Sequence, residues 1–251
     1  MREIHTDSIV SVNKDRLSDN FDERQYLIDY MGIKDIWRLF RIMAEFSESF
    51  EVMGNMPDAV SVFGSARTPE SHPMYQQARQ LGKRIAQEGF ATITGGGPGI
   101  MEAVNRGAYE ENGISIGMNI ELPLEQKPND YLTTQLDFRY FFIRKVMLVK
   151  YSVAFVIFPG GFGTLDELFE ALTLIQTRRM RPFPVILYCK DYWEGMMNWI
   201  RDKLLVETNI SKDDLTLLTV TDSIEEVIER VKGSDLIGRQ QNTSASGVEN
   251  A

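Results

Sequence analysis

The stretch Val153–Glu167, V-A-F-V-I-F-P-G-G-F-G-T-L-D-E, decides the fold class of this chain. It opens with an uninterrupted apolar run, which is typical of a strand buried on both faces of a sheet. The run ends at Pro159 and a cluster of glycines, and a helical pattern begins near Thr164. A buried strand that passes through a glycine turn into a helix predicts a βαβ unit of a parallel sheet.

The same alternation of apolar runs and helical segments extends over residues 57–232. The predicted strands are Val60–Phe63, Phe90–Thr94, Ile114–Ile120, Thr134–Phe138, Val153–Phe158, Val185–Tyr188 and Leu215–Val220. The predicted helices lie near 74–88, 99–111, 139–151, 164–178, 191–205 and 223–232. Gly89 and Gly113 stand where a glycine commonly follows a helix. The pattern indicates an α/β domain with a doubly wound, mainly parallel, Rossmann-like sheet flanked by helices.

The two ends of the chain have different patterns. Residues 1–33 are polar and lack periodicity, which predicts a flexible N-terminal arm. From residue 34 apolar side chains recur at steps of three and four, which predicts an extra helix over 34–56, packed on the main domain or on a second subunit. This stripe consists of Ile36, Phe40, Met43, Phe46 and Phe50. Residues 233–251 are polar and are predicted to be a disordered tail.

The composition excludes several classes of function. The chain has 251 residues and a net charge of −9, which argues against a large surface for nucleic acid or anionic membrane. Cys189 is the single cysteine, and His5 and His72 are the only histidines. An internal disulfide and a thiolate zinc cluster are therefore excluded, and a His-rich metal centre is disfavoured. Because no apolar run reaches the ~18 residues of a membrane span, we expect a cytoplasmic protein.

The glycines after the predicted strand at 153–158 are typical of a phosphate cradle, a loop whose backbone N–H groups bind a phosphate. Gly160, Gly161 and Gly163 let a ligand approach the backbone closely, and Thr164 adds a hydroxyl at the helix N-terminus. Glu167 follows three residues later and offers a carboxylate beside this cradle. The alternative is a capping box, with Thr164 as the N-cap and Glu167 at the third helical position.

The glycines after the strand at 153–158 are the second glycine cluster of the chain. The first glycine cluster, T-G-G-G-P-G at 94–99, leaves an earlier predicted strand and enters a helix. Parallel strands bring their carboxyl ends to one edge, so both clusters are expected there, where ligands bind. Neither cluster matches the dinucleotide fingerprint or a P-loop, which disfavours NAD and ATP. The alternative is a tight turn without a ligand. Gly64 and Ser65 also follow a strand, and Arg67 either pairs with a phosphate or forms a surface ion pair.

The helix between the two clusters carries two adjacent cations, Arg144 and Lys145, after Phe141 and Phe142. Such cations hold a nucleotide when their helix enters a phosphate site, and otherwise lie on a solvated face. The two aromatic residues are typical of a core and less typical of a base-stacking platform.

Taken together, these motifs resemble the Lonely Guy (LOG) family of cytokinin riboside 5′-monophosphate phosphoribohydrolases. Its P-G-G-x-G-T-x-x-E motif corresponds to Pro159–Glu167, and its G-G-G-x-G-I/L-M element to Gly95–Met101. Its Arg-Lys pair corresponds to Arg144-Lys145, and the likeness covers about residues 58–232. One departure bears on base preference: Phe141-Phe142 stands where plant-like members have Met-His.

The resemblance implies hydrolysis of the N-glycosidic bond of a purine nucleoside 5′-monophosphate, AMP or a cytokinin riboside monophosphate. The products are the free base and ribose 5-phosphate. Glu167 is then the catalytic carboxylate, which stabilises an oxocarbenium-like state, and Arg144 is its catalytic partner. The remaining expected substrate-binding residues are Gly64, Ser65, Gly96, Gly97, Met101, Glu102, Lys145, Pro159, Gly160, Gly161, Gly163 and Thr164.

The resemblance also implies no metal, no organic cofactor and a homodimer or larger homo-oligomer. Related sequences carry the label "possible lysine decarboxylase", but no lysine here has a recognisable setting for a pyridoxal-phosphate Schiff base. The alternative function is a non-catalytic carrier of a nucleotide or of molybdenum cofactor, which shares the fold and the glycine loops. A DNA-handling module is disfavoured by the net charge of −9.

Overall fold

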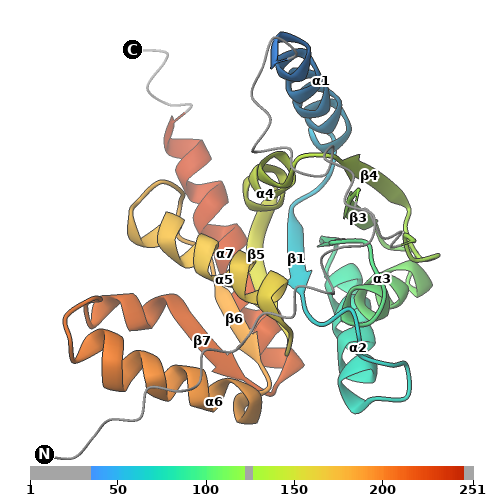
Figure 1. Ribbon diagram of the computed structural model, residues 1–251. Helices are drawn as coiled ribbons and strands as arrows, with labels where there is room; N and C mark the ends of the chain where they lie inside the picture. The colour runs from blue at the N-terminus through green and yellow to red at the C-terminus, as the bar shows by residue number, and fades with distance from the viewer. Residues whose placement is uncertain (1–34, 122–126, 246–251) are drawn as a thin grey trace, which may run out of the picture. The chain divides into compact units, whose positions relative to one another are not determined.

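The computed structural model describes residues 35–121 and 127–245, with side chains described for 37–121 and 127–234. Within these residues, seven strands form one sheet in the order β4-β3-β2-β1-β5-β6-β7, and each pair of neighbours is parallel (Figure 1). The strands are β1 (Ala59–Phe63), β2 (Ala91–Thr94), β3 (Ser115–Ile120), β4 (Thr134–Phe138), β5 (Ser152–Ile157), β6 (Val185–Tyr188) and β7 (Leu218–Thr221). The prediction of a doubly wound parallel sheet is confirmed. The arm predicted for 1–33 lies outside the described residues.

Helices connect these strands in the order that the alternating pattern predicts. They are α1 (Asp35–Met53), α2 (Pro73–Gln87), α3 (Ile100–Glu110), α4 (Phe141–Lys150), α5 (Phe162–Gln176), α6 (Lys190–Trp199) and α7 (Ile224–Ala245). A π-helical turn over Ile200–Leu205 continues α6, and a 3-10 helix over Asp213–Leu217 precedes β7. Across the described residues, every helix is too short or too polar to cross a membrane.

The chain divides into two units between Arg41 and Ile42. Of the first unit, the structure describes the opening turns of α1, where the rings of Trp37 and Phe40 have centroids 6.0 Å apart. The second unit, from Ile42 onwards, contains the whole sheet.

In the second unit both faces of the sheet are covered by helices. α2, α3 and α7 pack on one face, which receives Val60 and Val62 of β1. α4, α5, α6 and the second half of α1 pack on the other face, which receives Ala59 and Phe63. A parallel sheet buried on both faces needs apolar residues at successive positions, which explains the continuous apolar runs.

The second half of α1 faces the core with a different set of residues from the predicted stripe. Ile42, Phe46 and Met53 pack into the core, whereas Met43 and Phe50 are exposed. Of the predicted residues in this half, Phe46 alone contacts the core. From Ile42 onwards, α1 therefore packs on the sheet along a face shifted from the predicted one.

Three predicted boundaries differ from the structure. Leu215–Leu217 lies in a 3-10 helix because Ser211 and Asp214 bond to each other's backbone N–H and fold the chain into a turn. The left-handed residue after α3 is Asn112, with Gly113 one position later. α7 continues to Ala245, so residues 233–245 of the predicted tail are helical.

The sheet order places a topological switch point between β1 and β5. From β1 the chain builds outward through β2, β3 and β4, and then returns to place β5 on the other side of β1. The loops that leave the carboxyl ends of β1 and β5 therefore diverge and leave a crevice between them. The second glycine cluster follows β5, and Gly64 and Ser65 follow β1.

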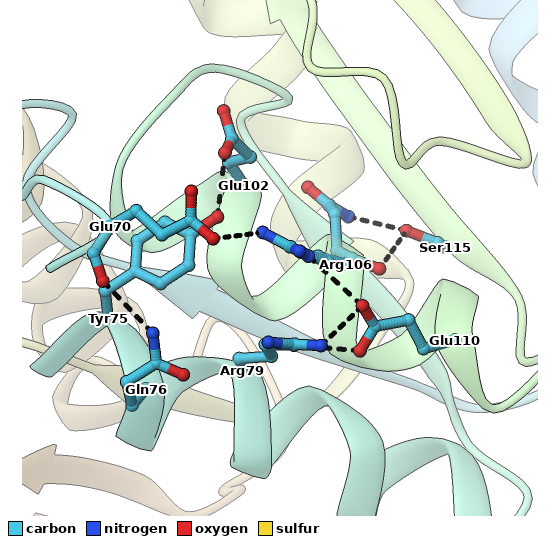
Figure 2. Close-up of polar contacts among 9 residues, drawn as sticks. Glu70, Tyr75, Gln76, Arg79, Glu102, Arg106, Glu110 and Ser115 are labelled. Atoms are coloured by element: carbon cyan, nitrogen blue, oxygen red, sulfur yellow. Dashed lines mark hydrogen bonds and ion pairs between the residues drawn. The ribbon is translucent and has the colours of Figure 1, made fainter.

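α2 and α3 cross with their backbones in close contact, at one glycine on each helix. A Cβ atom on Gly82 would lie 2.0 Å from the Val104 carbonyl oxygen, and one on Gly107 would lie 1.9 Å from the Arg79 carbonyl oxygen. Beside the crossing, Arg79 and Arg106 both bind the Glu110 carboxylate (Figure 2). Glycine is required because the obstructing atoms belong to the backbone.

We predict that Gly107→Ala lowers the free energy of unfolding by roughly 1–3 kcal/mol, as overpacking of a well-packed interior does. The matched control is Gly195→Ala on α6, where an added Cβ meets no atom within 4 Å. This control should gain about 0.5–1 kcal/mol from helix propensity. Urea unfolding of both variants measures the difference, and equal effects would contradict the backbone contact.

Candidate functional site

A cleft of about 680 Å³ opens at the carboxyl ends of β1 and β5. The β1–α2 loop and the first residues of α3, α4 and α5 form its walls. The predicted site residues that line it are Gly64, Ser65, Met101, Arg144, Gly161, Gly163, Thr164 and Glu167. Arg67, Phe141 and Asp166 line it too, so the cleft brings two cations, two carboxylates and aromatic rings together.

Backbone hydrogen bonds lock three loops together at the base of this cleft. The Phe158 N–H donates to the Phe63 carbonyl at 2.8 Å, and the Ser65 N–H donates to the Pro159 carbonyl at 3.0 Å. The Ser65 carbonyl in turn accepts the Ile100 N–H at 3.0 Å, at the start of α3. These bonds extend the β1–β5 pairing beyond the strands and fix the loops in relation to one another.

The start of α5 does not form the capping box that the sequence offers as the alternative. Its N-cap is Gly161, so Thr164 is the third helical residue and Glu167 lies in the second turn. A Cβ on Gly160 would lie 2.1 Å from the Thr164 hydroxyl oxygen, whereas Cβ atoms on Gly161 and Gly163 would meet open space. The first turn of α5 thus presents bare backbone to the cleft. The Thr164 N–H donates to the Gly161 carbonyl at 3.0 Å, so the N–H groups of Phe162 and Gly163 are the ones that lack an intrahelical partner.

Glu167 is a buried carboxylate at the edge of the cleft, with 5% of its surface exposed. Its Oε2 atom is buried, lies 3.4 Å from the Lys145 ammonium and has no hydrogen-bond partner among the described residues. Burial raises the pKa of Glu167 above its ordinary value, and the charges of Lys145 and Arg144 oppose this rise. A desolvated carboxylate without a short bond to a cation can interact strongly with a positive charge that enters the cleft.

Arg144 lies on α4 in the same cleft and is also largely buried, and its Nε has no hydrogen-bond partner within the described part of the chain. Burial lowers the pKa of Arg144, the charges of Glu167 and Asp166 oppose this, and arginine stays protonated. A Cβ on Gly95 would lie 3.1 Å from Arg144 Nη2 and 2.8 Å from Met101 Sδ. The first glycine cluster therefore borders this arginine.

A smaller cavity of about 70 Å³ adjoins Arg144 on the side of the first glycine cluster. Its lining residues are Gly95, Gly97, Met101, Asn119, Ile120 and Arg144. Arg144 and Met101 border both spaces, so both glycine clusters meet at these two side chains.

Five predicted site residues lie outside the walls of both spaces: Gly96, Glu102, Lys145, Pro159 and Gly160. Gly96 has a φ of +71° and turns the loop after β2. Pro159 and Gly160 offer their carbonyl oxygens to Ser65 N–H and to the Tyr192 hydroxyl. Lys145 points to a neighbouring groove on α5 and binds carboxylates there. Their places support the loops or Glu167 more directly than a ligand in the cleft.

Glu102 does not line the cleft, and its side chain reaches Tyr75 of α2 (Figure 2). It accepts a hydrogen bond from the Tyr75 hydroxyl at 2.7 Å, and burial together with this carboxylate raises the pKa of Tyr75 to about 12. Glu102 is predicted to bind substrate, but its bond to Tyr75 favours a structural role between α2 and α3.

Two supporting residues escape sequence reasoning. The Tyr192 hydroxyl donates to the Gly160 carbonyl at 2.7 Å and so anchors the loop after β5 from α6. The Asn129 side-chain amide donates to the carbonyls of Gly96 and Gly97 and to Asn105 Oδ1. Each of these residues bonds to a glycine more than thirty positions away in the sequence. No local spacing of residues therefore predicts the contact.

Sequence comparison finds relatives with a common name. The chain is 29% identical over 150 residues to a rice protein (Oryza sativa subsp. japonica) named "Probable cytokinin riboside 5'-monophosphate phosphoribohydrolase", over 57% of this chain and 59% of that one. It is 28% identical over 170 residues to a Mycobacterium tuberculosis protein named "Cytokinin riboside 5'-monophosphate phosphoribohydrolase", over 65% of this chain and 88% of that one.

Solved structures share the fold. The X-ray structure of TM1055, a structural genomics target, matches with a TM-score of 0.55 and 22% identity, over 70% of this chain and 99% of that one. A molybdenum cofactor binding protein from Rippkaea orientalis matches with a TM-score of 0.50 and 24% identity, over 70% and 94%. At this identity the likeness concerns the fold alone.

The family model described as "Possible lysine decarboxylase" matches residues 101–231, from the start of α3 to α7, and thus includes Arg144, the second glycine cluster and Glu167. Because this match covers more than half of the chain, the chain belongs to that family, the LOG family.

Proposed function

We propose that this protein hydrolyses the N-glycosidic bond of a purine nucleoside 5′-monophosphate, AMP or a cytokinin riboside monophosphate, to free base and ribose 5-phosphate. The observation that carries the proposal is the buried Glu167 carboxylate beside Arg144 in the cleft at the β1–β5 switch point. The names of the curated relatives support the same reaction class.

The first turn of α5 is suited to the 5′-phosphate. Gly161 and Gly163 leave its backbone open, and a helix N-terminus attracts an anion through free N–H groups and the helix dipole. Thr164 lines the same wall, and Arg67 faces the cleft from the β1–α2 loop. A phosphate bound here places the ribose one turn along α5, toward Glu167.

Glu167 is suited to the charge that develops on the ribose. As the bond from C1′ to the base nitrogen breaks, positive charge spreads over C1′ and the ring oxygen, and an ionised carboxylate stabilises it. The carboxylate also accepts the proton of the attacking water, which forms the new C1′–O bond. Its low exposure strengthens these interactions because little water screens them.

Arg144 is suited to the departing base and to orientation of the nucleotide. Its guanidinium stays charged and offers fixed donors, so it stabilises the electrons that return to the base. Met101 and Phe141 supply apolar surface on the same wall for a flat purine ring.

A homodimer or larger homo-oligomer stays a prediction. Next to the cleft, exposed Phe162 and Phe169 line an open groove on α5, and apolar surface of this kind is typical of protein contacts.

The activity is tested with a panel of nucleoside 5′-monophosphates that includes AMP and isopentenyladenosine monophosphate. We expect base release from at least one of them, and Glu167→Gln should lower kcat by about 10²–10⁴-fold, the range for loss of a positioned acid–base group. Chromatography of free base and ribose 5-phosphate measures both. Glu194→Gln, an exposed change on α6, is the matched control and should leave the rate unchanged.

The carrier alternative makes the opposite prediction. A protein that binds AMP tightly but releases no base from any nucleotide would contradict the hydrolase and favour a carrier of a nucleotide or of molybdenum cofactor. Absorbance from a pterin that copurifies with the protein would identify a carrier of molybdenum cofactor.

The raised pKa of Glu167 predicts a stability difference of known sign. Because burial favours the protonated carboxyl, its ionised form destabilises the fold, and this effect grows as pH rises through the raised pKa. Glu167→Gln, which resembles the protonated state, should therefore have a higher Tm than the wild-type protein at pH 8. The two Tm values should converge at pH 4. Differential scanning calorimetry checks this, and a lower Tm for the variant at pH 8 would contradict it.

Tyr192→Phe removes the hydroxyl that anchors the Gly160 carbonyl. Because the loop then holds the phosphate less firmly, we expect KM for the nucleotide to rise about 3- to 10-fold, consistent with a net hydrogen bond of about 1 kcal/mol, with little change in kcat. Tyr109→Phe, an equally exposed tyrosine on α3, is the control. Steady-state kinetics separates the two constants, and a loss confined to kcat would argue against this role.

A further inference from the structure

A cluster of charges on α4 and α5 lies directly behind Glu167. The Lys145 ammonium contacts Asp166 at 2.8 Å, Glu170 at 2.7 Å and Glu167 at 3.4 Å. The three carboxylates come from little more than one turn of α5, and 15% of the lysine side chain is exposed. One partly buried cation is therefore shared among three anions.

The distances show how the lysine is shared. An ammonium has three donors, and the two short contacts go to Asp166 and Glu170. Glu167 has the long contact, and its Oε2 atom makes no hydrogen bond within the described residues. The flanking carboxylates thus hold the ammonium near Glu167 without a short bond to it.

Glu170 lies outside the cleft in which the nucleotide is proposed to bind. Glu167 and Asp166 line the cleft, whereas Glu170 and Lys145 line the neighbouring groove on α5. Glu170 can therefore influence a reaction in the cleft through Lys145 and through its own charge.

We propose that Glu170 is a positioning residue for the hydrolysis. By holding the Lys145 ammonium in a short hydrogen bond, it keeps that ammonium from a short bond to Glu167 Oε2 and so limits how strongly it neutralises the Glu167 carboxylate. This inference rests on the proposed function, because it assigns Glu167 its catalytic role.

The charged groups that face Glu167 set the expected direction. Lys145 and Arg144 on α4 favour its ionised form, whereas burial and Glu170 on its own helix favour the protonated form. Asp166 competes for Lys145, and Arg67 faces the same cleft from the β1–α2 loop. Loss of the Glu170 charge removes one opposing group and frees the lysine for Glu167, so the carboxyl should ionise at lower pH.

The test is the pH profile of kcat/KM for base release in Glu170→Gln, Lys145→Gln and the double variant. The acid limb should move to lower pH in Glu170→Gln and to higher pH in Lys145→Gln. In the double variant, Glu170→Gln should move the limb less than it does in the wild-type background. Glu111→Gln, which loses an ion pair with Lys83 on the distant α2–α3 pair, should leave the limb in place.

An unmoved limb in Glu170→Gln, or an equal movement in both backgrounds, overturns the proposal. Should Glu170→Gln fail to fold, Lys145→Gln alone decides, because a limb that does not move to higher pH removes the link.

A second readout separates this inference from the proposed function. In protein labelled with [5-¹³C]glutamate, the Glu167 carboxyl signal is assigned by its loss in Glu167→Gln and is titrated directly. Absence of base release by the wild-type protein would defeat the hydrolase. The titration would still show whether Glu170→Gln moves the ionisation of Glu167 to lower pH, and an unchanged titration would defeat the positioning role.

Discussion

The parallel pairing of β1 with β5 is the constraint on which the rest of the site depends. It brings together strands that are far apart in sequence, and it continues past their ends through the bonds from Phe158 to Phe63 and from Ser65 to Pro159. Because Ser65 also accepts the Ile100 N–H, the start of α3 is tied to the same point. Both glycine clusters, and the helices that follow them, are thus held at one crevice.

The chemistry of this crevice depends on buried charged groups whose hydrogen bonds are incomplete. Glu167 is buried beside two cations, yet one of its oxygens and the Arg144 Nε make no hydrogen bond among the described residues. Buried polar atoms are ordinarily satisfied, so such exceptions point to a functional role. The absence of side chains at three glycines opens this site. Gly161 and Gly163 leave bare backbone on one wall, and Gly95 makes room for Arg144 and Met101 on another.

Sequence patterns predict the parts of this structure that depend on which residues follow one another along the chain. The apolar runs predict the parallel sheet, and the residues after β1 and β5 lead to the cleft. The start of α5 at Gly161 was not predictable, because Thr164 and Glu167 satisfy the spacing of a capping box equally well. The Tyr192–Gly160 bond and the Gly82–Gly107 crossing depend on tertiary packing, which leaves no periodic signal. Glu102 is the clearest case, since its place in the motif suggests the ligand while its side chain binds Tyr75.

The most direct test of the account is a crystal structure of Glu167→Gln with bound AMP. The account predicts a phosphate on the N–H groups of the first turn of α5 and the C1′ atom beside residue 167. It also predicts the purine against Met101 and Phe141, within reach of Arg144. A phosphate held elsewhere, or a glycosidic bond that faces away from residue 167, would contradict it.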